Sequence, residues 1–93
     1  MDGHGLLYIL ERGGNALRVV DNGGKIRTVA GTGKAGPLKD GPALECPLNS
    51  PKYIWIERNG KVLIADSSNH AIRRYDPSTN TLTNVAGTGQ AAP

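Results

Sequence analysis

An internal repeat restricts the fold of this chain more than any other feature. The pentapeptide Val-Ala-Gly-Thr-Gly stands at 29–33 and again at 85–89, 56 positions later. Two further pairs of segments align at a shift of 55, namely 5–11 with 60–66 and 16–21 with 71–76. The one-residue difference falls in a stretch of turn residues, where an insertion costs little. The chain is therefore two copies of one unit.

Each unit is predicted to be a series of short antiparallel strands, because apolar or alternating runs are bounded by Gly, Asn and Asp. The first unit has three such runs, at 6–10, 17–20 and 26–30. The second unit has four, at 53–57, 62–65, 72–75 and 82–86. No segment keeps a helical period for ten residues, and 13 Gly with 6 Pro argue against a helical bundle. One helical turn is expected, at 42–46, between two prolines.

Four short antiparallel strands per repeat predict the blade of a β-propeller. The expected fold class is all-β, with about two blades per chain, the first lacking its innermost strand, and with oligomerisation completing the propeller. The expected organisation is a first blade at 1–36, a long loop with a short helical turn at 37–52, and a second blade at 53–93.

One stretch of the second unit has a more specific pattern. The run from Ile64 to Asp76, IADSSNHAIRRYD, resembles the hallmark of the NHL-repeat family. The segments 85–89, 40–43 and 48–51 resemble the long-loop variety of that repeat. The resemblance implies a β-propeller, commonly of six blades, that serves as a binding scaffold; some members bind protein or RNA, and a few related propellers are enzymes. The first unit departs from the pattern, because Gly14-Asn15 replace Asn69-His70.

Acidic and arginine residues recur at matching places in both units. They are Glu11, Arg18 and Asp21 in the first, and Asp66, Arg73 and Asp76 in the second. Such a set could ligate a cation or form an acid/base pair, or it could supply ladder salt bridges and turn caps. Recurrence favours the structural role, because every blade needs its turns whereas an active site is usually built once.

The remaining motif residues are also expected to be structural. Asn69 can accept a left-handed conformation, and the His70 imidazole can hydrogen-bond across to a neighbouring blade, which we favour over metal binding or catalysis. The recurring glycines are predicted to form the turns that end the outer strands: Gly31, Gly33, Gly87 and Gly89. Trp55 is either part of the core between blades or an exposed aromatic anchor.

Motifs that would indicate a cofactor or a reaction are absent or incomplete. Residues 31–36 spell G-x-G-x-x-G, but Pro-rich 37–42 follows where a dinucleotide site needs a helix. Cys46 is the single cysteine and is expected to pack as a small apolar side chain. The sequence has no Ser-His-Asp spacing and no zinc-ligand cluster. We therefore expect no catalytic residue, no metal, no cofactor and no enzymatic activity.

The charges and the ends of the chain give coarser expectations. The net charge of +3 is spread along the chain, with scattered basic residues and no basic stripe, so nucleic acid is not an expected partner. No apolar run approaches the roughly 18 residues of a membrane span, and no signal peptide is recognisable. We expect a soluble chain of unassigned compartment. The abrupt ends suggest a segment deliberately cut from a longer protein.

Two incomplete blades would leave two apolar sheet faces in water, and repeats of this kind need at least three units for stability. We therefore expect a homo-oligomer, most simply a trimer with about six blades. The expected function is a non-enzymatic, self-assembling propeller scaffold that presents a face to a ligand or protein. The alternative is a fragment of a propeller enzyme or RNA-binding NHL domain whose site requires further blades.

Overall fold

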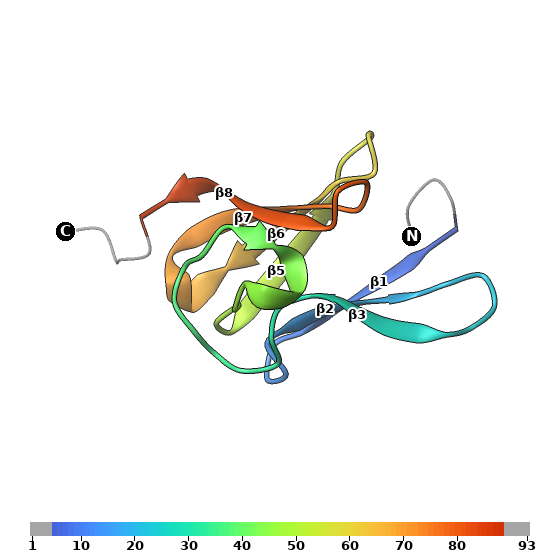
Figure 1. Cartoon of the computed structure of the whole chain (residues 1–93), viewed down its shortest axis with the longest axis horizontal. Coiled ribbons are helices and arrows are strands. Elements are labelled where there is room, and N and C mark those ends of the chain that lie inside the picture. Colours follow the sequence, from blue (N-terminus) through green and yellow to red (C-terminus); the bar gives the residue numbers. More distant parts are fainter. Residues whose placement is uncertain (1–4, 89–93) are drawn as a thin grey trace.

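Two antiparallel sheets make up the fold in a computed structural model, which describes residues 5–88; the turn expected at Gly89 lies outside this range. The first sheet has the order β1-β2-β3, and the second has the order β4-β8-β7-β6-β5 (Figure 1). The first sheet consists of β1 (Leu7–Glu11), β2 (Ala16–Val20) and β3 (Ile26–Ala30). The second consists of β4 (Gly41–Pro42), β5 (Pro51–Ile56), β6 (Val62–Asp66), β7 (Ala71–Asp76) and β8 (Thr81–Gly87). The all-β, antiparallel prediction is confirmed.

All seven predicted strands are present, with ends that differ by two residues at most. An eighth strand, β4, was not expected, so the second sheet has five strands instead of four. Gly41 pairs with Leu82 and Pro42 with Thr81, at the edge of the sheet. An edge position tolerates proline, because no further strand needs its missing N–H group.

Two single turns of 3₁₀ helix lie between strands. The predicted helical turn is η1 (Ala43–Glu45), and it is shorter than the expected 42–46. A second turn, η2 (Ser67–Asn69), was not predicted. It ends at His70, whose backbone is left-handed with φ 50°, so the left-handed conformation considered for Asn69 falls on the next residue instead.

One hydrophobic core joins the two sheets. Inner face denotes the side of each sheet that packs against the other sheet, and outer face the opposite side. Tyr8 of β1 meets Tyr75 of β7 edge-on, with ring centroids 6.4 Å apart. The core also takes side chains from residues 31–50, which we call the connection. Its buried members are Tyr8, Leu17, Val19, Val29, Ala30, Ala43, Cys46, Leu48, Val62, Ile64, Tyr75 and Leu82. Each large aliphatic side chain buried here contributes about 1.5–3 kcal/mol.

The repeat in the sequence is a repeat in backbone geometry. The register of β2 on β3 shifts between Leu17 and Arg18, and that of β7 on β8 shifts between Ile72 and Arg73. These two places align at the shift of 55, so both sheets carry the same irregularity at the same position. Equivalent residues in the two sheets can therefore be compared directly.

Candidate functional site: a buried ion pair and two exposed sheet faces

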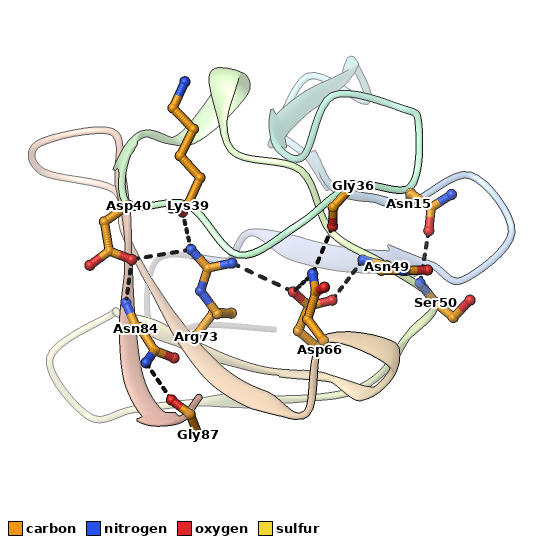
Figure 2. Close-up of polar contacts among 11 residues, drawn as sticks. Asn15, Gly36, Lys39, Asp40, Asn49, Ser50, Asp66, Arg73, Asn84 and Gly87 are labelled. Atoms are coloured by element: carbon orange, nitrogen blue, oxygen red, sulfur yellow. Dashed lines mark hydrogen bonds and ion pairs between the residues drawn. The ribbon is translucent and has the colours of Figure 1, made fainter. Parts of the chain in front are cut away.

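An ion pair lies fully buried between the second sheet and the connection (Figure 2). Arg73 of β7 places Nη1 3.5 Å from Oδ2 of Asp66, and neither side chain is exposed to solvent. The Arg73 Nη2 atom donates to the carbonyl oxygen of Lys39 and lies 3.4 Å from Oδ1 of Asp40. A buried charge is tolerated when it is paired in this way.

Asp66 accepts further hydrogen bonds from the connection and from η2. Its Oδ1 atom accepts from the Asn49 backbone N–H at 2.7 Å, and its Oδ2 atom accepts from Asn69 Nδ2 at 2.9 Å. The Asn69 amide also donates to the carbonyl oxygen of Gly36 at 2.9 Å. Asp66, Asn69 and Arg73 together hold the connection against the second sheet.

The equivalent pair in the first sheet is not covered. Arg18 Nη1 lies 3.4 Å from Glu11 Oε1, and the two side chains are 36% and 41% exposed. Exposed pairs of this kind contribute little to stability.

Asp21 and Asp76 act as turn caps at equivalent positions. Asp21 Oδ1 accepts from the backbone N–H groups of Gly23 and Lys25. Asp76 Oδ1 accepts from the hydroxyl and the backbone N–H of Ser78. The Ser78 hydroxyl is the main reason why the pKa of Asp76 is lowered, and the Ser78 N–H and nearby Lys61 lower it further.

The recurring glycines occupy two kinds of place. Gly31 and Gly87 have positive φ, and a Cβ there would collide with the carbonyl oxygen of Asn15 and of His70 respectively. Gly33 also has positive φ, but it faces open space.

Asn15 is a contact residue that sequence analysis noted only as a departure from the pattern. It is left-handed, with φ 51°, as His70 is at the aligned position. Its Oδ1 atom accepts from the backbone N–H of Ser50 at 2.8 Å. The alignment of Asn15 with His70 was the signal that could have identified it.

The structure adds little for cofactor chemistry. Within residues 5–88, no group of three or more His, Cys, Asp or Glu side chains could hold a metal ion. The G-x-G-x-x-G segment is followed by non-helical residues 37–40 and then by β4, so no helix begins at this segment. Cys46 is fully buried, and this burial is the main reason why its thiol pKa is raised. In the same range, no helix is long and apolar enough to cross a membrane.

The outer face of the second sheet is exposed and largely apolar; it also carries Arg74, which lies opposite Leu63 and forms an ion pair with Glu57 at 2.8 Å. Trp55 is 71% exposed and Ile72 is 37% exposed. Two shallow hollows of about 380 and 420 Å³ lie on this face and share Ala65 and Ile72 in their walls. The apolar residues of the face are Tyr53, Trp55, Leu63, Ala65, Ile72 and Ala86.

No family model matches the chain. The chain is 35% identical over 79 residues to NHL repeat-containing protein 2 of Gallus gallus. The aligned stretch covers 83% of this chain and 11% of that protein. It is 35% identical over 83 residues to NHL repeat-containing protein 2 of Homo sapiens, across 89% of this chain. The chain belongs to the NHL-repeat family.

Two further similarities complete the comparison of this NHL chain. It is 36% identical over 73 residues to Protein SUPPRESSOR OF QUENCHING 1, chloroplastic, of Arabidopsis thaliana, across 77% of this chain and 7% of that protein. The chain thus spans about a tenth of the length of its curated relatives. A crystal structure of a protein of unknown function from Bacteroides thetaiotaomicron matches with a TM-score of 0.79 over 91% of this chain and 22% of that one. At 19% identity this match shows the fold alone.

Proposed function

We propose that this NHL chain is a non-enzymatic scaffold unit that assembles head-to-tail with copies of itself into a multi-bladed propeller, with three chains supplying six blades. Each sheet counts as one blade in this proposal. The main support for it comes from aligning the two sheets by the sequence repeat. In this alignment, the exposed face of each sheet corresponds to the buried face of the other.

The outer face of the first sheet corresponds to the inner face of the second. Leu7 is 44% exposed, whereas Val62, its equivalent 55 residues later, is fully buried. Ile9 is 36% exposed, whereas its equivalent Ile64 is fully buried. The same contrast holds for Ile26 with Leu82 and for Arg18 with Arg73.

The converse holds for the outer face of the second sheet. Ile72 is 37% exposed, and its equivalent Leu17 is fully buried against the second sheet. Leu63 corresponds to Tyr8, which packs on Tyr75 in the core. A second copy that placed its first sheet on this face would therefore repeat the apolar part of a contact that already exists inside one chain, although Arg74 stands where the internal contact has the buried Val19. Such a front-to-back contact is heterologous and can close into a ring.

The first test of this proposal is the mass of the chain in solution. Light scattering at micromolar concentration is expected to give about three times the 9.8 kDa chain mass. A well-folded monomer under these conditions would contradict the proposal.

Two charge substitutions test the direction of the contact. Ile9→Asp alters only the outer face of the first sheet, and Ile72→Asp alters only that of the second. Each variant alone is expected to be a folded monomer, because a charged side chain placed in the apolar contact must lose its water, at a cost of several kcal/mol. An equimolar mixture is expected to form a 1:1 dimer, because each variant keeps the face that the other lacks.

Leu44→Asp is the matched control for these variants. Leu44 is an exposed leucine on η1, which belongs to neither sheet, so this change should leave the oligomeric mass unaltered. If the Ile9→Asp chain still associates by itself and the mixture forms no dimer, the front-to-back contact is wrong.

A further inference from the structure

The 420 Å³ hollow on the outer face of the second sheet has a filled counterpart on the first sheet. The hollow is lined by Ala65, Ser67, His70, Ala71, Ile72, Ala86 and Gly87. The equivalent places on the first sheet include Leu17 and Ala30, which have no exposed surface. Residues of the connection cover them, and Ala43, Cys46 and Leu48 belong to the same core cluster.

Two polar contacts fix the connection in its place on the first sheet. The backbone N–H of Gly31 donates to the carbonyl oxygen of Ala43 at 3.0 Å. Asn15 Oδ1 accepts from the backbone N–H of Ser50 at 2.8 Å. One contact thus holds each end of the segment 43–50.

The hollow on the second sheet has the same two anchoring positions. Gly87 aligns with Gly31, and both have positive φ with the same close approach to a backbone carbonyl. His70 aligns with Asn15, and both are left-handed, with φ 50° and 51°. A neutral imidazole has one ring nitrogen that accepts a hydrogen bond, so His70 can replace the Asn15 amide oxygen.

We infer that this hollow binds a loop segment with the chemistry of residues 41–51, with His70 accepting a backbone N–H and Gly87 donating to a backbone carbonyl. This inference rests on the proposed blade-to-blade assembly. The ligand is a short peptide with a small residue, then two apolar residues, in the order of Ala43, Cys46 and Leu48. Recognition depends on backbone groups at the two ends and on apolar burial between them.

A synthetic peptide of sequence 41–51 is the probe, titrated into the full chain carrying Ile9→Asp so that self-assembly does not cover the hollow. Saturable shifts of the amide resonances of His70, Ala86 and Gly87 are expected in NMR spectra. A peptide with Asp in place of Ala43 and Leu48 is the matched control and should cause no shifts. Equal shifts with both peptides, or shifts only at other residues, would overturn the inference.

Substitutions at His70 test its role as the acceptor. Loss of one such hydrogen bond, by His70→Gly, should weaken peptide binding about three- to tenfold, whereas His70→Asn should keep the affinity within about twofold. Glycine is chosen because it tolerates positive φ, so the backbone is not strained. Unchanged affinity in His70→Gly would contradict the assignment.

The corresponding substitutions can be made at Asn15, which forms the equivalent hydrogen bond within the chain. Asn15→His should leave the unfolding equilibrium constant within about twofold, while Asn15→Gly should raise it about three- to tenfold. An Asn15→His chain that is as unstable as Asn15→Gly would show that an imidazole cannot serve at this position. Peptide binding without self-assembly would count against the proposed function alone. Self-assembly without peptide binding would count against this inference alone.

Discussion

Gly31 and Gly87 occupy equivalent positions in the two sheets at which only glycine fits. At Gly31 the chain leaves β3, and at Gly87 it leaves β8, in each case against the backbone carbonyl of the left-handed residue in the neighbouring hairpin, Asn15 or His70. Only glycine meets both requirements at this place, because the backbone is left-handed and no space exists for a Cβ.

Gly31→Ala is expected to destabilise the chain far more than Gly24→Ala. Both residues have positive φ, but a Cβ at Gly24 meets no atom within 4 Å. Gly24→Ala should therefore cost only the left-handed backbone penalty of about 1 kcal/mol, and Gly31→Ala about 3 kcal/mol or more. Urea unfolding of both variants in the Ile9→Asp chain measures the difference. Equal losses in the free energy of unfolding would show that the collision of the new Cβ with the Asn15 carbonyl is relieved without cost.

The residue patterns predicted some sites and not others. Asp21 and Asp76 lie where a strand ends and turn residues begin, which is a local pattern that a sequence displays directly. The buried contacts of Asp66 with Asn49 and of Arg73 with Lys39 join residues 17 and 34 positions apart. Nothing in the local sequence indicates which loop will cover which strand, so these partners could not be predicted.

At the scale of elements, the strands were predictable because their apolar residues form short continuous runs or alternate with polar ones, between turn residues. β4 and η2 were not. Gly41-Pro42 has the composition of a turn, and it forms a strand only because the connection returns along β8. Ser67–Asn69 has no apolar period, and its turn is fixed by tertiary bonds, such as that from Ser68 N–H to the Asn49 carbonyl.

Because the connection covers only the arginine in β7, the equivalent arginines of β2 and β7 are expected to contribute unequally to the stability of the chain. Arg73→Met should destabilise the chain by about 3–5 kcal/mol, because it leaves Asp66 buried without its cation. Arg18→Met should cost less than about 1 kcal/mol, because Glu11 is partly exposed to water. Denaturant unfolding in the Ile9→Asp chain checks both values. Similar losses in the two variants would mean that coverage by the connection does not set the cost.

At the scale of the whole molecule, the single core shared by both sheets predicts one cooperative unfolding step. Cys46 can report this step, because its thiol is fully buried and its pKa is raised by that burial. Reaction with a thiol reagent requires the thiolate and access to the sulfur, so it should wait for unfolding.

Labelling of Cys46 is therefore expected to be slow in the native Ile9→Asp chain and to accelerate with urea in parallel with the loss of β-structure. Arg73→Met should accelerate labelling at zero urea, and Arg18→Met should leave the rate nearly unchanged. The absorbance of a released aromatic thiol, followed beside circular dichroism, measures both. Fast labelling that is independent of urea would mean that the connection opens separately from the sheets.

The bonds that attach the connection to both sheets have a geometric consequence for the proposed assembly. They fix the rotation that relates one sheet to the next within a chain, and the same rotation would apply at each contact between chains. A closed circle forms only when whole multiples of this rotation complete a full turn. The packing of Tyr8 on Tyr75 and the burial of Ala43 in the core would therefore set how many sheets complete the circle. A bulkier side chain at either place would change the angular step of the assembly, and a step that no longer divides the turn would give an open spiral.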